Sequence, residues 1–254
     1  IVSISKVTDD IVKNVAPDVE LHHIPHAVDP SVFAKLPEET VQEFKKNNNL
    51  FEKTVFFWNN RNARRKQSGS LIFWFKDFLD KVGHDKATLI MHTDPTDPHG
   101  QDLAAILAML GLTNGEVKFS RNKVDPAALA MFYNAADCTI NGIGLEPASK
   151  SIIGSQEVPY IYEDRLSGED VVDAMEKIHN MTQEEKNKLG EKGRAHVLKN
   201  YNFEDYCTRW DELLLDIHKR HGSWDTRTGY NRWTFKEGNS TRPVFNEVWL
   251  WRAR

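Results

Sequence analysis

The sequence predicts an α/β protein built on a doubly wound, Rossmann-like parallel sheet that is incomplete. Between residues 54 and 140, short apolar runs alternate with longer segments of helical spacing, and this alternation is typical of βαβ units. The runs are almost wholly apolar, as strands covered on both faces are. After residue 140 the alternation stops. Too little chain follows to finish such a sheet.

Composition narrows the class of protein. The chain has 254 residues, a formal charge of −4, 40% hydrophobic and 28% charged residues, enough for one core. No apolar run approaches about 18 residues, so no membrane span is expected, and the near-neutral charge argues against nucleic acid as the main partner. Cys138 and Cys207 cannot form a disulfide framework, and we expect two reduced structural thiols. Ile1 opens no signal peptide, so the chain reads as the middle of a longer, cytoplasmic protein.

The first 47 residues predict three elements. Residues 5–15 open with a hydroxyl cap and continue with apolar residues at helical spacing. Residues 19–25 alternate as a strand does and end at a proline. Residues 37–47 have the charged pattern of a surface helix.

The central part predicts four strands joined by helices. The strands are 54–58, 87–92, 117–119 and 137–140, and the helices are 71–81, 102–110 and 126–135. Residues 59–70 are expected to form a polar turn. The Pro- and Asp-rich stretch 93–100 is expected to be a solvated loop, because its histidines show no convergence on a metal.

The last part predicts helices only. They cover 168–179, 182–200 and 203–218, and the second begins with Thr182 and Glu185 at capping-box spacing. The segment 222–254 is rich in Trp, Gly and Arg, and its pattern predicts no element.

Four stretches resemble the donor-binding domain of GT-B glycosyltransferases, in the large retaining family often called group 1 or GT4. The stretches are 24–33 (Ile-Pro-His-Ala-Val-Asp-Pro-Ser-Val-Phe), 55–61 followed by Lys66 (Val-Phe-Phe-Trp-Asn-Asn-Arg, then Lys), 124–137 (Val-Asp-Pro-Ala-Ala-Leu-Ala-Met-Phe-Tyr-Asn-Ala-Ala-Asp), and 188–203, from Lys-Leu-Gly-Glu-Lys-Gly-Arg to Tyr-Asn-Phe. They stand in the family's order and together cover about 200 residues. His26, Ala27 and Asn60 depart from the family's usual Asn, Gly and Gly.

The resemblance implies the C-terminal half of a two-domain enzyme. Residues 1–35 would be the inter-domain linker with a first helix and strand, and 36–221 the nucleotide-sugar-binding domain. Residues 222–254 would be a tail that packs on an N-terminal acceptor domain not present here. The implied partners are a UDP- or GDP-sugar donor, a glycan or small-molecule acceptor, and that acceptor domain. No cofactor and no metal ion are implied.

Arg61, Lys66 and Asn60 are the expected diphosphate-binding residues. Arg61 and Lys66 flank the turn after a buried strand, at the carboxyl edge where open α/β sheets bind ligands. An arginine offers a fork to two phosphate oxygens, a lysine a point charge, and the next helix adds its amino terminus. In GT-B enzymes such a pair commonly replaces a metal ion. The alternative is a solvated basic loop or a nucleic-acid patch, and Arg64 and Arg65 are expected to be surface charges.

The resemblance places the nucleotide base on the loop after the third central strand. The residues concerned are Phe119, Ser120, Arg121 and Asn122, and in the family this contact is made largely by backbone groups. An ordinary loop is the alternative interpretation.

The family's Glu-Gly-Phe-Gly-x-x-x-x-Glu motif is not found. Asn141-Gly-Ile-Gly-Leu-Glu146 resembles it only superficially, with Asn141 and Ser149 at the two Glu positions. The catalytic and donor-sugar residues therefore stay unknown. Only 18 positions separate Asn141 from Pro159, whereas one βαβ crossover takes about 30 residues.

Two explanations fit this shortening. Either the protein is truly shortened and catalytically dead, or a segment is missing from the sequence. The second explanation predicts a spatial break near Asn141–Gly142, wider than the roughly 3.8 Å between consecutive Cα atoms.

The sequence is compatible with three alternative functions. The first is a retaining, metal-independent glycosyltransferase whose leaving phosphate helps to deprotonate the acceptor, by family resemblance. The second is a degenerate nucleotide-binding module that scaffolds other proteins. The third is nucleic-acid binding by residues 61–66, which the charge of −4 disfavours.

Overall fold

The computed structural model describes residues 1–140, 145–153 and 160–223. The described residues divide into two compact units: a sheet unit, residues 27–203, and a terminal unit, residues 1–26 with 204–223. In this division residues 27–35 group with the sheet and most of the last helix groups with the N-terminus. The domain limits expected from the sequence stay a prediction. The predicted break at Asn141–Gly142 and nearly all of the tail lie outside the described residues.

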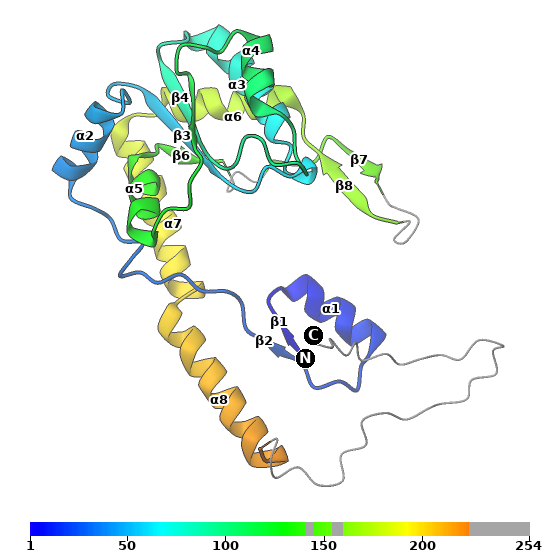
Figure 1. Ribbon diagram of the computed structural model, residues 1–254. Helices are drawn as coiled ribbons and strands as arrows, with labels where there is room; N and C mark the ends of the chain where they lie inside the picture. Colours follow the sequence, from blue (N-terminus) through cyan, green and yellow to red (C-terminus); the bar gives the residue numbers. More distant parts are fainter. Residues whose placement is uncertain (141–144, 154–159, 224–254) are drawn as a thin grey trace. The chain divides into compact units, whose positions relative to one another are not determined.

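The sheet unit is built on four parallel strands (Figure 1). They are β3 (Thr54–Asn59), β4 (Ala87–His92), β5 (Val117–Ser120) and β6 (Cys138–Thr139), in the order β5-β4-β3-β6. The chain runs outward from β3 through β4 to β5, and then returns to the other side of β3. The switch point of the topology therefore lies between β3 and β6.

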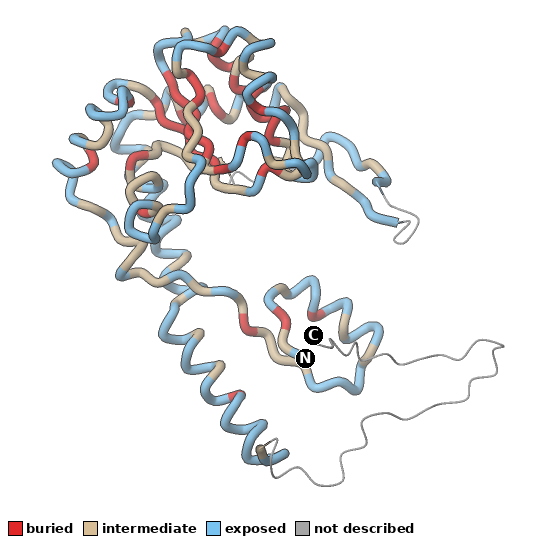
Figure 2. Tube along the Cα trace, in the orientation of Figure 1, coloured by how far each residue is buried: buried red, intermediate tan, exposed pale blue. Residues whose placement is uncertain are grey.

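Alternate residues of the strands enter two cores. Phe56 and Trp58 point to a large core with α3 (Ser68–Val82), whereas Val55 and Phe57 point to a smaller core. Figure 2 shows the buried residues of this unit concentrated along the sheet and the helices beside it. The prediction of a doubly wound parallel sheet is thus confirmed.

The helices of this unit cover both faces of the sheet. α4 (Leu103–Leu110) and α6 (Gly168–Asn180) pack on α3, and α2 (Glu38–Asn47) packs on α5 (Pro126–Ala135). The aromatic rings of Phe56, Phe75 and Phe78 meet in the large core, with centroids 5.6–6.1 Å apart. Edge-on aromatic packing of this kind adds to the stabilisation from buried area.

An antiparallel hairpin stands where further parallel strands would be expected. It consists of β7 (Ser149–Ile152) and β8 (Tyr162–Arg165), and it was not predicted. Its residues are half-buried or exposed, so they lack the apolar run of a buried strand. In the described residues the parallel sheet stops at β6, which confirms that the domain is partial.

The capping box of α7 (Gln183–Asn200) is present as predicted. The Thr182 amide donates to the Glu185 carboxylate at 2.8 Å, and the Glu185 amide donates to the Thr182 hydroxyl at 3.3 Å. Two amides that the helix cannot satisfy internally are bonded in this way.

The terminal unit contains a βαβ element and the last helix. β1 (Val2–Ser3) pairs in parallel with β2 (His22–His23), α1 (Lys6–Val15) connects them, and α8 (Phe203–His221) follows α7. The predicted strand 19–25 is wrong in length, because only two residues pair. The Arg220 guanidinium binds both oxygens of Glu20, at 2.7 and 3.0 Å.

α1 turns its apolar residues outward. Val7, Ile11 and Val15, spaced by four residues, are 57–80% exposed, and Ile4 beside them is 55% exposed. The buried residue of this helix is Asp9, which bonds Ser3 and lies 3.1 Å from the His23 ring. These four apolar residues form the α1 stripe, an apolar surface on and just before α1 that no described residue of the terminal unit covers.

The two cysteines differ in their surroundings, and Cys207 is exposed rather than structural. Burial raises the pKa of the Cys138 thiol to about 11, with the Asp137 carboxylate adding to the effect. Because the thiolate is the reactive form, we expect iodoacetamide at pH 8 to label Cys207 and to spare Cys138 until the protein is unfolded. Mass spectrometry of the labelled peptides checks this, and equal labelling of both in the folded protein would contradict it.

Candidate functional site

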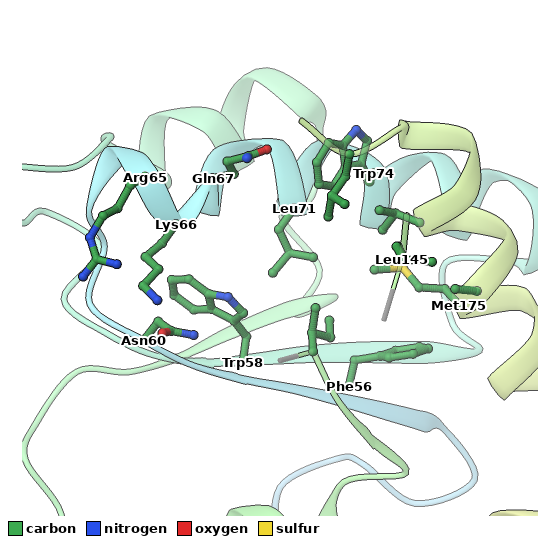
Figure 3. Close-up of a pocket in the computed structure, with 14 residues that line it drawn as sticks. Phe56, Trp58, Asn60, Arg65, Lys66, Gln67, Leu71, Trp74, Leu145 and Met175 are labelled. Atoms are coloured by element: carbon green, nitrogen blue, oxygen red, sulfur yellow. The ribbon is translucent and has the colours of Figure 1, made fainter. Parts of the chain in front are cut away.

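A cavity of about 290 Å³ opens at the carboxyl ends of β3 and β6 (Figure 3). Its walls come from the end of β3, the turn before α3, the start of α3, the residue after β6 and the first half of α6. This is the switch point of the topology, where open α/β sheets bind their ligands. The fold therefore places a hollow where a ligand is expected.

The cavity has two chemically different ends. Figure 3 shows Asn60, Arg65 and Lys66 together at one end, and Trp74, Leu145 and Met175 at the other. The ring of Trp58 and the side chain of Leu71 lie between them. A ligand with a charged part and a less polar part matches this division.

The polar end carries two cations next to a helix terminus. Arg65 and Lys66 belong to a short 3-10 turn, η1 (Arg64–Lys66), which leads into α3. No acidic residue occupies the first turn of α3, and no described carboxylate pairs with either cation. The positive end of the helix dipole and the two side chains thus favour an anion here.

Arg61 does not line the cavity. Its guanidinium binds the Asp97 carboxylate through two hydrogen bonds, Nε to Oδ2 at 2.6 Å and Nη2 to Oδ1 at 3.1 Å. The guanidinium also holds the pKa of Asp97 well below its usual range. Of the three predicted diphosphate ligands, Asn60 and Lys66 line the cavity together, and Arg61 lies against the loop after β4. Arg65 is exposed, as expected of a surface charge, and it lines the cavity as well.

Asn62 is a structural centre that the sequence did not reveal. Its side chain is fully buried: Oδ1 accepts a hydrogen bond from the Ser68 hydroxyl at 2.6 Å, and Nδ2 donates to the Gln101 carbonyl at 2.7 Å. The backbone of Gly100 comes so close that a β-carbon there would lie 2.1 Å from the Asn62 carbonyl oxygen. Asn62 therefore fastens the loop after β4 to the turn that carries Lys66.

Two predictions about these loops need correction. The stretch 93–100 was expected to be solvated, but two of its own residues, Thr93 and Pro95, are buried. The polar turn 59–70 is also too long: α3 begins at Ser68 rather than at residue 71. The reason is the αL conformation of Gln67, with φ 51°, which reverses the chain and starts the helix early.

The predicted base-binding residues lie further along the same edge. Phe119 and Ser120 end β5, two strands from β3, which corresponds to roughly 10 Å. Phe119 packs on the large core, and the Ser120 hydroxyl lies 2.9 Å from His92 Nδ1. Arg121 and Asn122 are exposed. None of the four lines the cavity, and their role stays a prediction.

A second, larger cavity of about 660 Å³ lies between residues 28–45, α5 and α7. It borders Asp137, whose carboxylate lies 3.2 Å from the Lys186 ammonium and accepts the Val55 amide at 2.8 Å. Asp137 precedes β6, so this cavity reaches the amino end of the sheet. Its buried charges are paired with one another, and we do not assign it to the site.

Within the described ranges 1–140, 145–153 and 160–223, no three His, Cys, Asp or Glu side chains converge as metal ligands would. In the same ranges, no helix is both long and apolar enough to cross a membrane.

An open parallel sheet with a cation-lined cavity at its switch point defines a ligand-binding α/β domain. No family model and no curated protein matches the chain. Solved structures that are similar include a glycosyltransferase from Rickettsia africae ESF-5, with 15% identity and a TM-score of 0.62 over 86% of this chain and 63% of that one. HepE from Anabaena, in complex with UDP and glucose, has 13% identity and a TM-score of 0.62 over 85% and 62%.

A UDP-forming α,α-trehalose-phosphate synthase from Burkholderia vietnamiensis is also similar, with 12% identity and a TM-score of 0.59 over 86% and 59% of the two chains. The chain thus spans about three fifths of the length of these three solved chains. The fold is that of GT-B glycosyltransferases, and the sheet unit is a partial domain of that fold.

Proposed function

We propose that the cavity binds the diphosphate of a nucleotide sugar, and that the chain is the donor-binding half of a glycosyltransferase. The observation that carries this proposal is the position of Lys66. It lines the cavity beside Arg65, at the amino terminus of α3 and at the switch point of the sheet, with no carboxylate partner in the described part of the chain.

The chemistry of sugar transfer suits these groups. As the glycosidic bond of the donor breaks, negative charge grows on the diphosphate that leaves, and fixed cations stabilise this charge. Lys66 and Arg65 supply such charges, and the amino terminus of α3 adds the positive end of its dipole. A retaining reaction without a metal ion and membership of group 1 belong to the same proposal, supported by the four sequence motifs. A cytoplasmic location is proposed with them.

The size of the cavity suggests that it holds only part of the donor and that the rest extends along the edge of the sheet. About 290 Å³ is near the lower limit of ligand pockets, roughly 300–1,000 Å³. The cavity suits the sugar diphosphate alone, and the base would extend towards Phe119–Asn122, roughly 10 Å away at the end of β5. UDP is the first nucleotide to test because HepE was solved with UDP and glucose, and GDP is the second.

The acceptor side would come from a second domain. The α1 stripe is apolar and uncovered, and the β1–β2 pair has only two residues in each strand. Parallel sheets are ordinarily larger and covered on both faces. We infer that the terminal unit contributes to an acceptor-binding domain of a longer protein.

Calorimetry with UDP-glucose, UDP and GDP tests the proposed site. We expect Arg65→Ala to weaken UDP about tenfold, the loss of one charge-assisted hydrogen bond, and Asp80→Asn, on the far half of α3, to leave it unchanged. If wild type binds none of these nucleotides at millimolar concentration, the donor-binding function is wrong. Binding without sugar transfer to any acceptor or water would favour the scaffold module instead.

A further inference from the structure

Asp97 and His99 contact one edge of the Arg61 guanidinium, the edge formed by Nε and Nη2. A guanidinium has five N–H donors. Nε and one N–H of Nη2 bind Asp97, and Nη2 also lies 2.9 Å from His99 Nδ1. The same ring nitrogen lies 3.2 Å from Asp97 Oδ1, so the His99 ring packs against the Arg61–Asp97 pair. Nε and Nη2 are thus engaged, and the two N–H groups of Nη1 have no partner among the described residues.

The carboxylate that holds Arg61 is itself fixed. The Asp97 side chain is only 11% exposed, against 63% for Arg61, and Asp97 Oδ1 accepts the His99 amide at 2.9 Å. The loop that carries Asp97 is bonded to Asn62 through the Gln101 carbonyl and to the Gly69 amide of α3 through the Gln101 side chain, at 2.7 and 2.8 Å. Asp97 therefore has a set position relative to the turn that carries Lys66.

An exposed arginine without such partners would sample many rotamers, and ordering it on binding would cost conformational entropy. Here two partners have already ordered the side chain. They bind the Nε–Nη2 edge and leave Nη1 for an anion at the carboxyl edge of the sheet.

We infer that Asp97 and His99 are positioning residues, which hold Arg61 so that its Nη1 group meets the diphosphate of the donor. This inference rests on the proposed function. It assigns Arg61 a place at the rim of the site, next to the cavity that Arg65 and Lys66 line, and it makes the loop after β4 part of the donor site.

The opposite role is also physically conceivable, because the Asp97 charge repels phosphate and neutralises Arg61. Asp97 would then be a latch that the donor must displace. The two roles predict opposite signs: removal of the Asp97 charge weakens donor binding if Asp97 positions Arg61, and tightens it if Asp97 competes for Arg61.

A double-mutant cycle on the full chain separates these roles. Calorimetry with UDP is compared for wild type, Asp97→Asn, Arg61→Ala and the double variant. We expect Asp97→Asn to bind UDP about fivefold more weakly and Arg61→Ala about tenfold, as for one charge-assisted hydrogen bond. The double variant should match Arg61→Ala within twofold. His99→Ala keeps the loop carboxylate and should weaken UDP about twofold, again only when Arg61 is present.

Asp80→Asn, which breaks an exposed ion pair with Lys76 on α3, is the matched control and should bind UDP as wild type does. Tighter or unchanged binding by Asp97→Asn would overturn the inference while the donor site stands. An equal loss with and without Arg61 would overturn it too, because the effect would then come from the fold of the loop. If wild type does not bind UDP or GDP, the proposed function fails and takes this inference with it.

Discussion

Lys66→Ala is expected to weaken the binding of UDP about 10- to 100-fold. Lys66 lines the polar end of the cavity, and the loss of a hydrogen bond to a charged group costs about 1.5–3 kcal/mol. Its half-buried position shields it from salt more than a surface lysine. Calorimetry at a fixed ionic strength measures the change directly.

The stability of this variant should not fall, because Lys66 has no carboxylate partner in the described part of the chain. The urea midpoint of Lys66→Ala should therefore equal that of wild type. Lys66→Arg keeps the positive charge on a longer side chain. Its affinity for UDP should lie between those of wild type and Lys66→Ala. Lys53→Ala, a lysine before β3 that lines neither described cavity, is the control. UDP affinity within twofold of wild type in Lys66→Ala would remove the residue from the site.

Asn62→Ala is expected to destabilise the sheet unit by about 3 kcal/mol. The side chain is fully buried and joins Ser68 to the backbone of Gln101. Its removal leaves these buried groups unsatisfied, and each such group costs about 1–3 kcal/mol. The free energy of unfolding in urea measures the loss. Asn62→Asp keeps the acceptor but not the donor, and should be damaging as well because it buries a charge.

A second substitution reaches the same contact from the other side. A β-carbon at Gly100 would lie 2.1 Å from the Asn62 carbonyl oxygen, so Gly100→Ala must displace the loop after β4. Gly190→Ala is the matched control, because a β-carbon there meets nothing within 4 Å. If Gly100→Ala and Asn62→Ala each cost less than about 1 kcal/mol, the loops are not fastened as described.

The strands were predictable where burial is complete. The run Thr54–Trp58 is apolar at consecutive positions because both faces of β3 are covered, and Pro126 with Gly111 punctuate two of the helices. The hairpin β7–β8, whose residues are half-buried or exposed, carries no such pattern. Its local composition therefore does not distinguish it from a loop.

The site was predictable only in part, for a physical reason. The spacing after β3 indicated Lys66, because a strand that ends at the carboxyl edge delivers the next residues there. Which cation of residues 61–66 faces the cavity depends on the η1 turn and on Asp97, 36 positions away in sequence from Arg61. The burial of Asn62 depends on Gly100 and Gln101 in the same loop. Contacts between loops that are distant in sequence produce no periodic pattern in the sequence, so they could not be predicted from it.

The central claim is that a donor diphosphate binds at the polar end of the cavity between β3 and β6. A crystal structure of the protein with UDP tests it most directly. We predict phosphate density within hydrogen-bond distance of the Lys66 ammonium, next to the first turn of α3. Phosphates bound elsewhere, for example in the larger cavity beside Asp137, or no bound nucleotide at millimolar UDP, would contradict it.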